Sequence, residues 1–145
     1  NWSHSHIQVS GPYKGKRGFT VFNHLLPYVE QSALYDASKG YVHTRVSGRR
    51  MSATVIDAYL CPSEPSPSAK NGLGATTHGG AHHWATGNYS GNYFIFGAPE
   101  RKSTEGANRT AMLRDGLSNV IFFTERYRTC GTSGNPNAGV YVPAV

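Results

Sequence analysis

Three histidines lie within six residues of one another, in the segment Thr-His-Gly-Gly-Ala-His-His-Trp that ends at Trp84. Imidazole nitrogens this close together can bind zinc, copper or nickel. The segment is rich in glycine and has no neighbouring cysteine or carboxylate, whereas metal ligands usually stand on rigid elements. We therefore expect an exposed polar loop here, with a transition-metal site at His78, His82 and His83 as the alternative.

A second group of possible ligands lies in Asp115-Gly116-Leu117-Ser118-Asn119. Carboxylate and carbonyl oxygens are the ligands that calcium prefers. Asp and Asn side chains also bond their own backbone amides, which makes them common in turns. Because few ligands are visible, we expect a structural turn with no cofactor, and a calcium site that includes Asp115 is the alternative.

Three aromatic residues near these loops could serve a binding site, namely Trp84, Tyr89 and Tyr93. An aromatic ring complements the C–H face of a sugar, so these rings suit carbohydrate binding. The alternative is that they pack at the base of the loops.

The sequence carries no motif of a known catalytic class: no Gly-x-Ser-x-Gly elbow, no Walker loop and no His-Glu-x-x-His helix. Cys61 is followed by proline and has no evident base beside it. Glu30 and Glu125 are the carboxylates that stand in well-patterned segments, but nothing in the sequence brings them together. We expect no catalytic residue and no enzymatic activity.

Composition indicates one loop-rich domain with a modest core, since 145 residues include 17 glycines, 8 prolines and only 38% hydrophobic residues. Fourteen Lys and Arg stand against eight Asp and Glu, a formal net charge of +6. A basic surface favours anionic partners. The charges are spread along the chain, however, so solvated surface charge is the simpler interpretation.

Hydrophobic periodicity predicts an amphipathic helix from about residue 20 to about residue 36. Pro27 lies inside it, so we expect either a kink or two short helices that meet near Leu26. Apolar and aromatic runs predict strands over residues 92–96 and 120–126, the second being the strongest and central in its sheet.

Four ordered motifs carry a family resemblance over roughly residues 18 to 127. They are Leu25-Leu26-Pro27-Tyr28-Val29-Glu30-Gln31, Cys61-Pro62-Ser63-Glu64-Pro65, Asn88-Tyr89-Ser90-Gly91-Asn92 and Asp115-Gly116-Leu117-Ser118-Asn119-Val120. Together they resemble a bacterial surface-protein family of unknown function with a prepilin-type N-terminus, catalogued as a tenth family of bacterial solute-binding proteins.

The resemblance implies an α+β, pilin- or pseudopilin-like fold, with a helix packed on a small antiparallel sheet and long loops. Residues 1–145 would form a single ectodomain, preceded in family members by an apolar helix and followed by a further C-terminal strand. An exported protein with two cysteines usually pairs them, which implies a disulfide between Cys61 and Cys130. Two buried free thiols are the alternative.

The function that the resemblance implies is that of a structural subunit of a bacterial cell-surface filament or secretion assembly. Its partners would be copies of itself or other pilin-like subunits, with membrane contact only through the apolar helix. An extracellular module that binds carbohydrate or a polyanion is the alternative, with an acidic glycan favoured over nucleic acid. The residues expected to matter most pack the fold: Leu25, Leu26, Tyr28, Leu34, Tyr35, Ile121 and Phe122.

Overall fold

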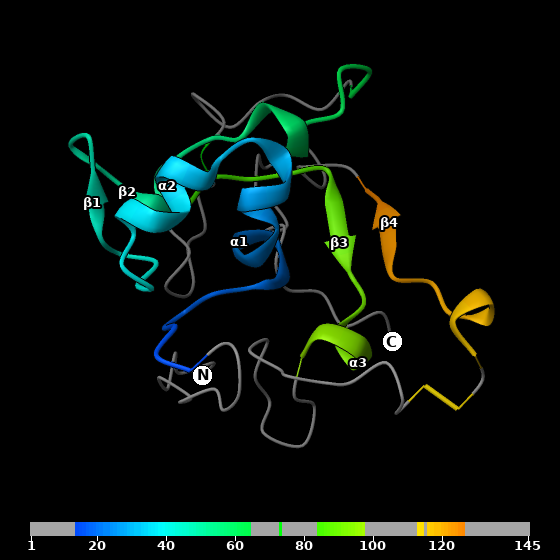
Figure 1. Ribbon diagram of the computed structural model, residues 1–145. Helices are drawn as coiled ribbons and strands as arrows, with labels where there is room; N and C mark the ends of the chain where they lie inside the picture. The colour runs from blue at the N-terminus through cyan, green and yellow to red at the C-terminus, as the bar shows by residue number, and fades with distance from the viewer. Residues whose placement is uncertain (1–13, 65–72, 74–83, 98–112, 115, 127–145) are drawn as a thin grey trace, which may run out of the picture.

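The computed structural model describes residues 14–64, 73, 84–97, 113–114 and 116–126 (Figure 1). Within these ranges the fold is α+β, with short helices and two separate two-stranded antiparallel sheets. The α+β class expected from the sequence is confirmed. No helix in the described part of the chain is long and apolar enough to cross a membrane.

The amphipathic segment forms consecutive short helices, α1 (Val21–Leu25), the 3-10 helix η2 (Leu26–Val29) and α2 (Ser32–Ala37). Pro27 stands at the start of η2, where its missing N–H costs nothing. Glu30 ends η2 in a left-handed conformation, with φ of 61°, and donates its N–H to the Leu26 carbonyl. The prediction of short helices that meet near Leu26 is therefore confirmed.

A tight hairpin follows, made of β1 (Arg45–Val46) and β2 (Arg49–Arg50). Its two turn residues, Ser47 and Gly48, have φ of 50° and 83°. Positive φ at both positions defines the type I′ turn, whose twist matches that of an antiparallel pair. The hairpin leads into the 3-10 helices η3 (Met51–Ala53) and η4 (Asp57–Tyr59).

The second sheet pairs β3 (Tyr89–Gly91) with β4 (Phe123–Glu125), in the register Tyr89 to Glu125. The short helix α3 (Tyr93–Phe96) follows β3, and the 3-10 helix η8 (Leu117–Asn119) precedes β4. Helix α1 lies against this sheet: the ring centroids of Phe22 and Phe123 are 6.0 Å apart.

Two strand predictions need correction. Residues 92–96 are not a strand, because the Asn92 side chain accepts the N–H of Phe94 and caps α3. The strand predicted over residues 120–126 exists only as β4, whose three residues are exposed. Within the described residues β4 pairs with β3 alone, so it is not central there.

The buried core consists of Phe19, Leu26, Val42, Met51 and Trp84, with Val29, Leu34, Tyr35, Ile56 and Tyr59 packed against it. The expected packing roles of Tyr28 and Ile121 are wrong, because these side chains are 83% and 66% exposed. The apolar stripe of the helical segment thus reaches the core through Leu26, Val29 and Leu34, and Tyr28 lies on the opposite face.

The entry segment is bound to the chain after α2 by the hydrogen bonds Arg17 N–H to Gly40 O and Val42 N–H to Arg17 O, of 2.7 and 3.1 Å. Gly18 allows this approach. Its φ is +70°, and a Cβ placed there would lie 2.6 Å from Val42 Cγ1. A side chain at position 18 would therefore collide with the core.

His24 of α1 is a titratable group beside this core. Its ring packs edge-on against Phe19 at 5.3 Å. Burial, together with the smaller effect of the nearby Lys16 ammonium, lowers the pKa of His24 to about 4. The imidazole is therefore neutral in the folded protein at neutral pH.

This depressed pKa predicts an acid-sensitive fold. The unfolded chain takes up a proton on His24 near pH 6.5, whereas the folded chain does so only near pH 4. The stabilisation is complete above about pH 6.5 and declines as the pH falls toward 4. We expect the midpoint temperature of unfolding, followed by circular dichroism, to fall more steeply over this interval in the wild type than in His24→Gln. Parallel pH profiles would contradict this.

Candidate functional site

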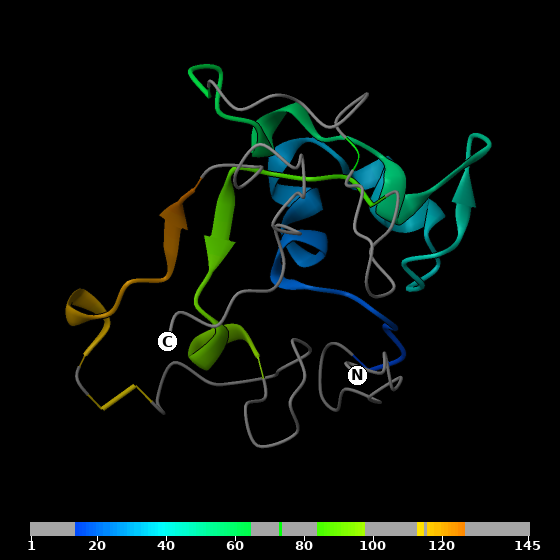
Figure 2. The ribbon, with the colours of Figure 1, turned by 180° about the vertical axis from the view of Figure 1, so that it is seen from behind.

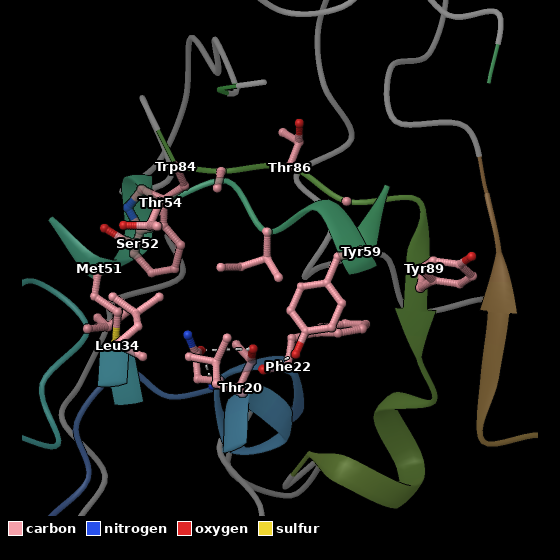
Figure 3. Close-up of a pocket in the computed structure, with 16 residues that line it drawn as sticks. Thr20, Phe22, Leu34, Met51, Ser52, Thr54, Tyr59, Trp84, Thr86 and Tyr89 are labelled. Atoms are coloured by element: carbon pink, nitrogen blue, oxygen red, sulfur yellow. Dashed lines mark hydrogen bonds between the residues drawn. The ribbon is translucent and has the colours of Figure 1, made fainter. Parts of the chain in front are cut away.

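A cavity of about 80 Å³ lies between the helical segment and the chain from η3 to β3 (Figure 3). Apolar side chains form much of its wall, including Phe22, Leu34, Met51, Ile56 and Trp84. Hydroxyl groups also line it: Thr20, Ser52, Thr54, Tyr59, Thr86 and Tyr89. A space of this size holds a few water molecules or one very small ligand.

The hydroxyls of the cavity wall differ in how they are bonded. Thr20 Oγ1 donates to Asn23 Oδ1 at 3.1 Å, and Thr54 Oγ1 donates to Arg50 O at 3.3 Å. Ser52 Oγ is buried and makes no hydrogen bond with the described residues. Burying a hydroxyl that has no hydrogen-bond partner costs free energy, so the Ser52 hydroxyl destabilises the fold.

Tyr59 joins η4 to α1 across the cavity. Its hydroxyl donates to the Phe22 carbonyl at 2.7 Å, and its ring packs edge-on against the Phe22 ring. Burial raises the pKa of Tyr59 to about 12. The phenol therefore stays protonated at neutral pH and continues to donate this bond.

The aromatic residues proposed as a sugar site do not share one surface. Trp84 is 8% exposed and packs in the core, with its ring 5.6 Å from that of His43. Trp84 and Tyr89 both line the cavity, although the Tyr89 ring points toward β4 in Figure 3. Tyr93 lies on α3 and lines a different hollow.

Most of the predicted ligand residues lie outside the described residues: His78, His82, His83, Asp115 and Cys130. Within the described ranges, no three His, Cys, Asp or Glu side chains come close enough to hold a metal ion. Cys61 is partly buried and forms no disulfide with another of the described residues. With Cys130 outside the described residues, the disulfide stays a prediction.

Asn88 joins three segments of the chain. It is 2% exposed, and its Oδ1 accepts the N–H of Cys61 at 2.9 Å. Its Nδ2 donates to a Glu64 carboxylate oxygen and to the Arg126 carbonyl. Its backbone N–H and C=O bond to Tyr59 O and Arg126 N–H, at 2.9 and 2.7 Å. The hydrogen bonds and burial of Asn88 make it a structural residue.

Asn92 repeats this arrangement at the other end of β3. Its Nδ2 donates to the Ile121 carbonyl at 2.9 Å, while its Oδ1 caps α3. Its backbone N–H donates to Phe122 O. The two asparagines of the Asn-Tyr-Ser-Gly-Asn motif therefore hold β3 and α3 to the segment around β4. The sequence assigns no structural role to either asparagine, because it predicts a strand over residues 92–96 and not over Tyr89–Gly91.

A larger hollow of about 400 Å³ lies at the end of the second sheet, between α3 and the segment that leads into β4. Large apolar side chains stand at its rim and are exposed: Phe94 at 67%, Ile121 at 66% and Phe123 at 40%. We call these three residues the apolar rim. Sequence reasoning had placed Ile121 in the core.

The sequence model of one protein family, SBP_bac_10, described as "Protein of unknown function (DUF1559)", matches residues 3–141. The chain belongs to this family. Membership in SBP_bac_10 confirms the resemblance to a family of unknown function, and it assigns neither an activity nor a pilin-like fold. Neither the curated proteins nor the solved structures include one that matches this chain.

The hydrogen bonds of Asn88 predict a large loss of stability in Asn88→Ala. Removing the amide leaves the Cys61 N–H, Glu64 and the Arg126 carbonyl without this partner in a partly buried place. We expect a loss of about 2–4 kcal/mol in the free energy of unfolding, measured in urea. Asn92→Ala is the control, since its side-chain bonds are exposed, and should cost about 1 kcal/mol. Equal losses would contradict the role given to Asn88.

Two buried serines provide a matched test of the cavity wall. Ser38 is 0% exposed; its Oγ donates to Tyr35 O at 2.6 Å and accepts the Gly40 N–H at 3.2 Å. Ser38→Ala should lower the free energy of unfolding by about 1–3 kcal/mol. Ser52→Ala should be neutral or stabilising, because its hydroxyl makes no such bond. A destabilised Ser52→Ala would show instead that the hydroxyl bonds to something in the cavity.

Proposed function

We propose that this SBP_bac_10 protein is a non-enzymatic structural subunit of a bacterial cell-surface filament or secretion assembly, with a pilin-like fold. The apolar rim is the observation that supports this most. Exposed apolar side chains that gather around one hollow of a small protein are typical of a protein–protein interface. Copies of this chain, or related pilin-like subunits, are the partners that we propose for it.

The position of the rim suits assembly. Phe94 lies on α3, Ile121 lies just before β4 and Phe123 lies on β4. The rim therefore spans two segments that the side chain of Asn92 fixes to each other. Rigid apolar anchors lose little conformational entropy when they bind, which favours association. In the described residues β4 pairs on one side only, and a strand edge of this kind can add a strand from a neighbour.

A carbohydrate-binding function has weaker support. Stacking on a sugar needs an aromatic face open to solvent, and the Trp84 indole is almost fully buried. Tyr93, which remains accessible in part, lies at the hollow bordered by the apolar rim. We therefore place its contact with a partner subunit ahead of contact with a sugar.

Assembly through the rim predicts that Phe94→Ser combined with Ile121→Ser weakens self-association of the full-length gene product by at least about tenfold. Burial of such side chains contributes about 1.5–3 kcal/mol each, and 1.4 kcal/mol is a factor of ten. Sedimentation velocity over a concentration series measures the change. Tyr28→Ser is the control: Tyr28 is also a large aromatic residue and is 83% exposed, but it does not line the hollow.

Two results would overturn the proposal. One is a full-length product that stays monomeric at all concentrations and is not cross-linked to other surface proteins on intact cells. The other is association that the double variant and Tyr28→Ser weaken equally.

A further inference from the structure

The hairpin of β1 and β2 brings two arginines directly opposite each other. Arg45 and Arg50 are cross-strand partners, and both are exposed. The adjacent pair of the ladder, Thr44 and Met51, is hydrogen-bonded: the Met51 N–H donates to Thr44 O at 2.9 Å. Hydrogen-bonded and non-hydrogen-bonded pairs alternate in an antiparallel ladder, so Arg45 and Arg50 form a non-hydrogen-bonded pair. Side chains approach most closely in such pairs.

This arrangement is unfavourable in the isolated protein. Like charges directly opposite each other destabilise a hairpin. Neither arginine forms an ion pair with a carboxylate of the described residues. One guanidinium nitrogen of Arg45 donates to the Gly48 carbonyl at 3.1 Å, which orients this side chain and leaves most of its five donors available.

We propose that Arg45 and Arg50 together bind one phosphate group, either free phosphate or a phosphate monoester carried on a larger molecule. This inference is independent of the assembly function. A guanidinium offers parallel N–H donors that match the oxygens of a phosphate, and two of them can hold one group from two sides.

Charge favours a phosphate monoester over other anions. Two guanidiniums carry two positive charges, and a phosphate monoester carries a charge of about −1.5 to −2 at pH 7. A carboxylate or a phosphodiester carries one negative charge and would leave part of the repulsion between the arginines in place. The dianion is therefore the ligand that compensates the pair.

The surroundings of the hairpin are also positive. Residues 14–50 contain seven Lys and Arg against two acidic residues. The segment that carries Lys16 and Arg17 is hydrogen-bonded to Gly40 and Val42, and Val42 O accepts the Ser52 N–H just after the hairpin. The hairpin projects at the opposite end of the molecule from β4 in both views (Figures 1 and 2). The field of this end attracts anions toward the arginine pair.

Titration of the whole chain with inorganic phosphate tests the proposal. The arginine side-chain N–H signals are followed by NMR, against sodium chloride at equal ionic strength. We expect Arg45 and Arg50 to shift together and saturably. Arg50→Gln should weaken phosphate binding by about tenfold or more, since a hydrogen bond to a charged group is lost. It should also raise the midpoint temperature without phosphate, because the repulsion is relieved.

Arg49→Gln is the matched control. It removes the same charge, but Arg49 pairs with Val46, and successive strand residues point to opposite faces. It should change the affinity by less than about threefold. Arg50→Lys keeps the charge without the paired donors and should bind more weakly than the wild type.

A second titration with glucose 6-phosphate distinguishes the sources. Equal or tighter binding than inorganic phosphate supports a monoester on a larger molecule, and much weaker binding supports free phosphate. Absence of a saturable shift with either probe, or equal weakening by Arg50→Gln and Arg49→Gln, would overturn the proposal.

Discussion

The structure depends on the buried amide of Asn88. The strands in the described part of the chain are two or three residues long, so their backbone ladders alone fix few segments to one another. Asn88 supplies hydrogen bonds between segments that longer strands would otherwise provide. Its side chain and backbone together bond to the segment from Tyr59 to Glu64 and to Arg126 after β4. These bonds of Asn88 thus tie the second sheet to the cavity wall.

Local backbone geometry explains which sequence predictions succeeded, and side-chain hydrogen bonds explain one that failed. The break at Leu26 was predictable, because the geometry of Pro27 acts locally. The helix at residues 93–96 was not predictable, because aromatic and β-branched residues favour a strand. The N-terminal cap from the Asn92 side chain overrode that preference. The amphipathic stripe that contains Leu26, Val29 and Leu34 followed from periodicity, whereas the α+β class was implied by the family resemblance.

The candidate sites were less predictable, because they depend on which side chains remain uncovered. Ile121 stands in an apolar run, and such runs predict burial, yet the run lies where β4 ends a sheet of two strands. Trp84 follows a polar segment that suggests a surface, yet its indole fills the core. Position in the fold decided both outcomes. The Arg45–Arg50 pair was equally hidden, since the sequence shows Arg49-Arg50 as neighbours and only the hairpin register selects the partner of Arg45.

The two uncovered features lie at opposite ends of the molecule and differ in chemistry. Burial of the apolar rim against a partner subunit would remove its apolar side chains from water, which is energetically favourable. The arginine pair gains stability when a dianion compensates its repulsion, and such a contact weakens with salt while an apolar one does not. A subunit that assembled through the rim would therefore leave its arginine hairpin facing away from that contact. The same separation means that anion binding and assembly can be altered one at a time, because no described residue belongs to both.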